Sequence, residues 1–191
     1  MRLMPDEPEP QGLTALMLLH HARRDARVDA AGDLVTLEDQ DRTRWNRDEI
    51  AEGTALLDAA VLRGRPGPYQ VQAAIAACHA TARDADETDW SGIAAFYGRL
   101  ADMVPSDVVK LNRAVAVAMA EGPAAGLALV EELASSGALS RYHLLEATRA
   151  DLLRRLGRRA EAAAAYREAL ELPSTEAERR YLSRRLAEVS I

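Results

Sequence analysis

Apolar residues recur along most of this chain at intervals of three and four positions, which is the spacing of one face of an α-helix. No stretch alternates apolar and polar residues for long, whereas glycine and proline divide the chain into segments of helical length. We therefore predict an all-α protein. The predicted helices cover about 12–29, 47–63, 69–83, 90–103, 106–122 and 123–134, a pair of helices within 142–173, and 175–189.

The same spacing predicts which residues of each helix face a core. Residues 5–10, which are rich in proline, are expected to form an extended entry before the first helix. Asn46 is expected to cap the second helix, with Glu49 completing a capping box. The residues expected in the core include Leu13, Leu16, Met17, Ala22 and Ala26 in the first helix, Ile50, Leu57 and Val61 in the second, Val71, Ile75, Cys78 and Ala82 in the third, and Val108, Leu111, Val115 and Met119 in 106–122.

The stretch 142–173 has the pattern of two helices joined by a tight turn. Gly157 can end the first helix because glycine adopts the left-handed conformation without strain, and Pro173 can end the second because proline has no N–H. Leu145, Leu152 and Leu156 are expected on the inner face of the first helix. The pattern resembles a tetratricopeptide repeat whose proline comes one place early. The matching positions are Ala150, Gly157, Ala162, Tyr166, Ala169 and Pro173.

One such repeat cannot bury its own apolar face, so neighbouring helix pairs are expected. We predict a right-handed stack of antiparallel helix pairs, a divergent tetratricopeptide-like solenoid, as a single helical domain over 1–191. An N-terminal helical region, 12–63, contains a motif loop at 37–53. Three helix pairs occupy 68–173, and a capping helix occupies 174–191.

Charge and composition narrow the class of protein. The net charge of −6 argues against a chain that binds nucleic acid as a whole. A single cysteine, Cys78, excludes an internal disulfide framework. No apolar run reaches the roughly 18 residues that span a membrane, and the acidic, proline-rich start is unlike a signal peptide. A cytoplasmic protein without membrane association is expected.

The sequence contains no recognisable catalytic or metal-binding pattern. His20 and His21 are adjacent, as are Cys78 and His79, so neither pair projects from one face of a helix. No phosphate-binding glycine loop or nucleophile elbow is present. We expect no enzyme activity, no metal and no cofactor.

The most unusual segment is EDQDRTRW (38–45), in which acidic, amide and basic side chains precede Trp45. One interpretation is a partner-binding surface, in which Trp45 is the anchor and the arginines make forked carboxylate contacts. The other is a structural loop whose charges pair with one another or with Arg23 and Arg24 while Trp45 fills the core. The candidate partner-binding residues are Asp39, Asp41, Arg42, Arg44 and Trp45.

Taken together, several segments resemble the C-terminal tetratricopeptide-like extension of a group of extracytoplasmic-function RNA polymerase sigma factors, bacterial proteins of the sigma-70 family. The segments are LMPDEPE (3–9), LMLLHHARRDAR (16–27), LEDQDRTRWNRDEIAEG (37–53), PYQVQAAIAACHA (68–80), AFYGRLADMVPSDVVKLNRAVAVAMAEGPAAGL (95–127) and RADLLRRLGR (149–158).

The resemblance implies a regulatory, protein-binding role in transcription initiation. The sigma-2 and sigma-4 domains of such factors have no counterpart here, so we expect no direct DNA contact and suspect that Met1 lies near a domain boundary. The expected partners are the sigma-2/sigma-4 domains of the parent chain or core RNA polymerase, and a homodimer is possible. The alternative function is a small-ligand sensor, with Tyr69, His79, Trp90 and Tyr97 as candidate lining residues.

Overall fold

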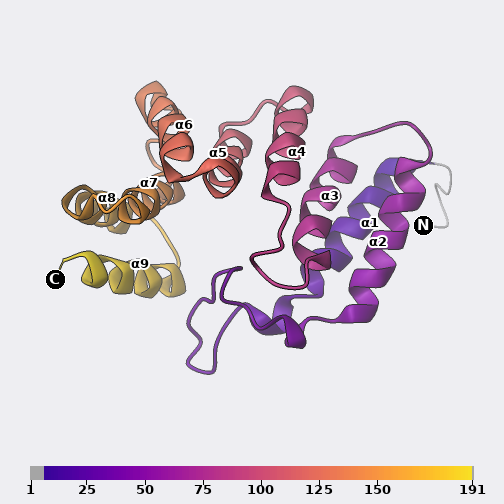
Figure 1. The fold of residues 1–191 in the computed structure, drawn as a ribbon, viewed down its shortest axis with the longest axis horizontal. Coiled ribbons are helices and arrows are strands. Elements are labelled where there is room, and N and C mark those ends of the chain that lie inside the picture. The colour runs from indigo at the N-terminus through magenta and orange to yellow at the C-terminus, as the bar shows by residue number, and fades with distance from the viewer. Residues whose placement is uncertain (1–6, 191) are drawn as a thin grey trace. The chain divides into compact units, whose positions relative to one another are not determined.

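Most helices of the chain pack against the helix that follows them in the sequence. The computed structural model describes residues 7–190, and within this range it contains nine α-helices, two short 3₁₀ helices and no sheet (Figure 1). The α-helices are α1 (Pro8–His21), α2 (Arg47–Val61), α3 (Pro68–Thr81), α4 (Trp90–Met103), α5 (Asp107–Glu121), α6 (Pro123–Ser136), α7 (His143–Arg155), α8 (Arg159–Glu171) and α9 (Glu176–Val189); the 3₁₀ helices are η1 (Arg24–Ala26) and η2 (Arg42–Arg44). The all-α prediction is confirmed.

The described residues fall into two compact units. The N-terminal unit comprises residues 7–29 and 35–105, and the C-terminal unit comprises residues 30–34 and 106–190. How the two units form the single domain expected from the sequence stays a prediction.

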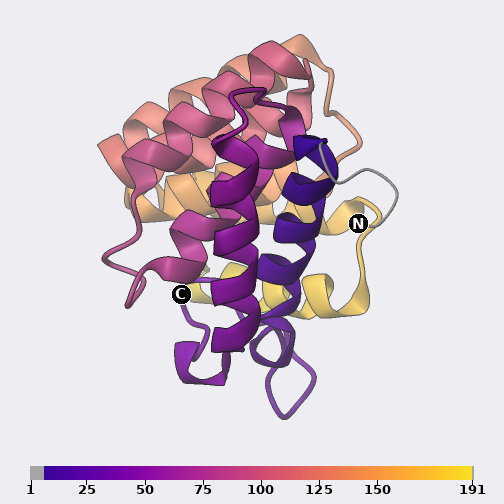
Figure 2. The same cartoon turned by 90° about the vertical axis from the view of Figure 1, so that its right-hand side faces the viewer.

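In the N-terminal unit, α1 packs against both α2 and α3, and α4 packs against α3. Figure 2 shows α1 and α2 lying alongside each other. The contact surface of α1 is made of small residues and one leucine: Gly12, Ala15 and Leu19 are buried. A Cβ built on Gly12 would lie 2.8 Å from the Gln70 backbone nitrogen, so glycine allows α1 and α3 to approach closely here.

This packing corrects the expected face of the first helix. Leu13 is 36 % exposed and Met17 is 63 % exposed, so neither belongs to the core. The helix also begins earlier than expected, at Pro8. Prolines fit there because N–H groups in the first turn have no partner within the helix. The part of the expected extended entry before residue 7 lies outside the described residues.

Several other expected core positions are also exposed or only half-buried. The Val61 and Val108 side chains and that of Leu156 are exposed, whereas Cys78 is half-buried. Each of these residues lies at the edge of its helix's apolar stripe or at a helix end, where helical spacing defines the buried face least well.

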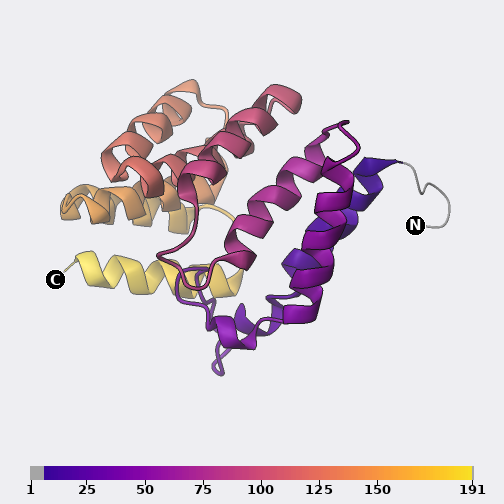
Figure 3. The ribbon, with the colours of Figure 1, turned by 45° about the vertical axis from the view of Figure 1, so that its right-hand side comes forward.

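The C-terminal unit repeats the helix pair. The α5 helix packs on α6, α7 on α8, and α8 on α9, as Figure 3 shows for the last two. Between α7 and α8, Gly157 has a φ of 74°, which confirms the predicted left-handed turn. Ala162, Tyr166 and Ala169 are all buried, so alanines bring the backbones together and the tyrosine fills the space between them.

The α5–α6 pair is packed even more closely, through Gly126. A Cβ on this residue would lie 2.3 Å from the Ala118 Cβ and 2.6 Å from the Ala114 carbonyl oxygen. Neither neighbour is the flexible end of a long side chain, so α5 and α6 would have to separate to accept one methyl group.

We therefore predict that Gly126→Ala destabilises the C-terminal unit by about 1–3 kcal/mol, the usual cost of overpacking. Chemical unfolding followed by circular dichroism measures the effect. The sign of the change in unfolding free energy is the decisive result. Without the close approach, replacing glycine by alanine within a helix stabilises the protein by about 0.5–1 kcal/mol. A variant as stable as the parent, or more stable, would contradict this packing.

Candidate functional site at the ends of α1, α2 and α3

Trp45 lies in the core of the N-terminal unit. Its side chain is only 3 % exposed, in the same apolar cluster as Leu19, Ile50 and Leu57. The sequence left two interpretations of this tryptophan, a docking anchor and a core residue. Its burial corresponds to the second, so the indole is not presented to a partner in this structure.

Arg42 connects the loop that precedes α2 to the end of α3. Its guanidinium carbon lies 4.5 Å from the centroid of the Trp45 ring, a cation–π arrangement. Its Nη1 donates to the carbonyl oxygens of His79 at 2.7 Å and Ala82 at 2.9 Å. Carbonyls at the end of a helix have no partner within it, and a cation is favourable there. Arg42 therefore acts as a C-terminal cap for α3.

The two aspartates of the candidate set accept local hydrogen bonds. Asp41 accepts from the Thr43 hydroxyl at 2.6 Å and from the Thr43 backbone N–H at 2.9 Å, and these bonds lower its pKa. Asp39 accepts from the Thr36 hydroxyl at 2.7 Å. By contrast, the exposed Arg44 side chain forms no hydrogen bond or ion pair with any residue that the structure describes. Arg44 is therefore the candidate without a structural contact of its own, while Asp39 and Asp41 are exposed but locally bonded.

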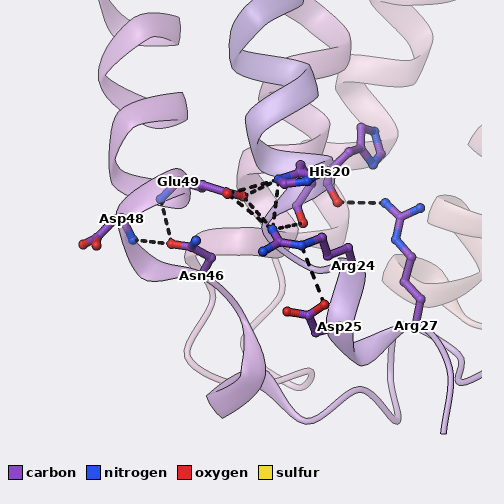
Figure 4. A network of polar contacts seen from close by, with 8 residues as sticks. His20, Arg24, Asp25, Arg27, Asn46, Asp48 and Glu49 are labelled. Atoms are coloured by element: carbon purple, nitrogen blue, oxygen red, sulfur yellow. Dashed lines mark hydrogen bonds and ion pairs between the residues drawn. The ribbon is translucent and has the colours of Figure 1, made fainter.

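A polar network joins the end of α1 to the start of α2 (Figure 4). The Asn46 side chain caps α2, accepting from the backbone N–H groups of Asp48 and Glu49 at 3.1 Å each. The predicted cap is therefore confirmed. The reciprocal half of the expected capping box is not formed, because the Glu49 carboxylate instead contacts His21 Nδ1 at 2.9 Å and Arg24 Nη1 at 3.3 Å.

Beside Trp45 the fold gathers five basic side chains, here called the basic cluster: His20, Arg23, Arg27, Arg42 and His79. Arg23 Nη2 lies 3.2 Å from His20 Nδ1, and Arg27 Nη2 donates to the His20 carbonyl at 2.8 Å. The Arg23 guanidinium carbon is 5.8 Å from the centroid of the same Trp45 ring that Arg42 covers. Among the described residues, no carboxylate forms an ion pair with any of the three arginines.

The pKa values in the basic cluster are lowered first by burial and then by the neighbouring positive charges. Burial, followed by the charges of Arg27 and Arg42, lowers the pKa of Arg23 to about 10. Burial, followed by Arg23, Arg42 and His20, lowers the pKa of His79 to about 4. His79 is therefore neutral near pH 7.

The sequence identified only part of this cluster. The spacing of His20, Arg23 and Arg27 is that of one face of a helix, so these three could be expected near one another. Arg42 and His79 join them only because the loop folds back on α3. Of the proposed sensor residues, His79 and Trp90 meet edge to face with ring centroids 5.1 Å apart. Tyr69 lies at the other end of α3, about 15 Å away along the helix axis.

Neither a metal-binding cluster nor a membrane-spanning helix occurs in the part of the chain that the structure describes. Among residues 7–190 there is no group of three or more histidine, cysteine, aspartate or glutamate side chains that could hold a metal ion. No helix in the same range is both long and apolar enough to cross a membrane.

Comparison with known proteins gives two matches. Residues 1–61 match a family of unknown function, DUF6596. The chain is also 50 % identical over 186 residues to the uncharacterized protein R00370 of Rhizobium meliloti (strain 1021). That match covers 97 % of this chain but 44 % of the relative, so the chain spans less than half the length of the curated relative it matches. No solved structure matches.

We predict that Arg42→Ala destabilises the N-terminal unit by about 1–3 kcal/mol, because two carbonyls at the end of α3 lose their donor. Both tryptophans, Trp45 and Trp90, lie in this unit, so tryptophan fluorescence during urea unfolding reports on it directly. Arg44→Ala is the matched control and should change stability by less than about 0.5 kcal/mol. Equal effects of the two substitutions would refute the capping role of Arg42.

A second prediction concerns pH. The folded pKa of His79, about 4, lies below the ordinary value of 6.5, so the unfolded chain takes up a proton first as the pH falls. Stability linked to His79 is present above pH 6.5 and is lost as the pH falls towards 4. The loss between pH 7 and pH 5 should be about 2 kcal/mol. His79→Gln should flatten this part of the profile of unfolding free energy against pH, and an unchanged slope would contradict the assignment.

Proposed function

We propose that this chain is the C-terminal regulatory and protein-interaction domain of an extracytoplasmic-function sigma factor, acting in transcription initiation. The observation that carries the proposal is the packing of the C-terminal unit, where α5–α6 and α7–α8 are successive close-packed helix pairs followed by α9. Arrays of this kind typically bind segments of other proteins on their exposed surface. The resemblance described above supplies the biological context.

The length of the Rhizobium meliloti relative is compatible with this role. More than half of that protein lies outside the match, which leaves room for further domains. The sequence resemblance makes sigma-2 and sigma-4 domains the expected content of the remainder in the parent of this chain. Its contacts would then be made with those domains or with core RNA polymerase.

Two exposed regions offer binding surfaces for such partners. In the N-terminal unit, Arg44 is exposed at the end of η2. In the C-terminal unit, an open hollow of about 430 Å³ on α5 and α6 is lined by leucines and by both signs of charge. Its lining includes Lys110, Arg113, Leu129, Glu132 and Leu133. A mixture of apolar and charged groups suits a protein segment better than DNA, whose phosphates select uniformly basic surfaces.

The experiment that tests the proposal is a calorimetric titration of this chain with the separately produced sigma-2/sigma-4 half of its parent, and then with core RNA polymerase. We expect saturable binding to at least one of them. Arg44→Glu and Arg113→Glu should each be tested, and reversal of the contacting charge should weaken binding about tenfold or more.

The matched control is Arg167→Glu, an exposed arginine on α8 that carries the same charge change. It should leave the affinity within about twofold of the parent. If neither the sigma half nor core polymerase binds while circular dichroism shows the chain to be folded, the proposed function is wrong.

The alternative function, a small-ligand sensor, is favoured by one observation, namely the unpaired guanidinium groups of the basic cluster. The two functions are separable. A sensor should gain thermal stability from a small molecule in the absence of any protein partner.

A further inference from the structure

The basic cluster brings arginine side chains together without carboxylate partners within residues 7–190. Arg42 has a structural role through Nη1, but Arg23 and Arg27 contact only His20 and, for Arg23, the Trp45 ring. Other arginines nearby are neutralised: Arg24, for example, pairs with Glu49 and Asp25. Among the described residues, no carboxylate forms an ion pair with Arg23, Arg27 or Arg42, although the Asp84 charge acts on Arg42 from a distance. Figure 4 shows the Arg27 guanidinium at the His20 carbonyl, apart from the Glu49 carboxylate.

Each of these guanidinium groups retains unused donors. A guanidinium has five N–H donors in a planar fork. Arg42 uses Nη1 for the two carbonyls and keeps Nε and Nη2, whereas Arg23 and Arg27 each use a single nitrogen, Nη2. The fork geometry of the remaining N–H groups matches the oxygens of a carboxylate or a phosphoryl group.

Two buried polar atoms at the same place also have no partner. Trp45 Nε1 and His79 Nδ1 are inaccessible to solvent and form no hydrogen bond. A buried polar group without a partner costs about 1–3 kcal/mol. Trp45 is the ring beneath the Arg23 and Arg42 guanidinium groups, and the His79 carbonyl is an acceptor of Arg42. Unpaired positive charge and unpartnered polar atoms therefore occur together.

We propose that Arg23, Arg27 and Arg42 form a binding site for a compact oxyanion, the phosphoryl or carboxylate group of a small ligand. The anion would accept from the unused guanidinium donors and relieve the repulsion among the cations. The bound anion would also favour protonation of His20, whose ring lies against Arg23. The site lies wholly within the N-terminal unit and does not depend on the proposed role in transcription.

A small anion fits these observations better than an acidic protein segment. Arg23 and Arg42 are half-buried and lie over a buried indole ring, so their donors are held near the core and do not extend into solvent. An extended acidic chain would be met more readily by fully exposed arginines such as Arg44.

The test uses inorganic phosphate, pyrophosphate and citrate as probes, titrated into the intact chain at constant ionic strength because exposed charges are screened by salt. Calorimetry gives the affinity, and NMR of the histidine rings gives the pKa of His20. We expect saturable binding at pH 7, together with a rise in the His20 pKa when the anion is bound. Preference for pyrophosphate would identify a phosphoryl ligand, and preference for citrate a carboxylate ligand.

Arg27→Gln is the main variant, because this side chain is exposed and its removal does not disturb the core. It should weaken binding about tenfold or more, the usual effect of losing a charge-assisted hydrogen bond. Arg23→Gln should do the same, provided that tryptophan fluorescence shows the N-terminal unit to be folded. Arg44→Gln, the control, should change affinity by less than about twofold.

Three results would overturn the proposal. The first is the absence of saturable binding of all three probes at millimolar concentration. The second is equal weakening by Arg27→Gln and Arg44→Gln, which would indicate a general charge effect. The third is binding of an oligoglutamate peptide when none of the small anions bind, which would assign the cluster to an acidic protein partner.

Discussion

The N-terminal unit depends on the burial of Trp45 beneath the Arg42 guanidinium. This single arrangement closes the core between α1, α2 and α3, and it supplies the donor for the last carbonyls of α3. It also holds the loop before α2 in place, where Asn46 can cap that helix and donate its own N–H to the Ala22 carbonyl at 2.9 Å. A charged, polar segment thereby becomes the structural joint of three helices.

This joint changes how the segment 37–53 relates to function. Its unusual composition is accounted for largely by local caps and by one buried indole ring. The resemblance of this segment to other proteins therefore reflects the requirements of the fold as well as those of any partner. The residues that remain available for recognition are those that the joint does not use. They include Arg44 on the exposed side of η2, Arg23 over the buried ring, and Arg27 beside the His20 carbonyl.

Local features of the fold could be predicted from the sequence. The cap at Asn46 and the left-handed turn at Gly157 depend on one or two neighbouring residues, and both are present. The buried face of α1 could not be predicted, because α1 packs on two helices through Gly12 and Ala15, whereas Leu13 and Met17 have the stronger apolar signal. The contact between Arg42 and His79 joins residues far apart in the chain, so no local pattern could reveal it. The basic cluster was therefore only half visible.

The central claim is that Arg42 and Trp45 of the 37–53 segment are internal structure, and that partners are met by exposed groups such as Arg44. Hydrogen exchange of the chain, alone and mixed with the sigma-2/sigma-4 half or core polymerase, tests it most directly. We expect amides around Trp45 and the end of α3 to be protected already in the isolated chain, with new protection appearing elsewhere on its exposed surface when a partner is added. Rapid exchange around Trp45 in the isolated chain, slowed only by the partner, would contradict the claim and make this segment the docking surface itself.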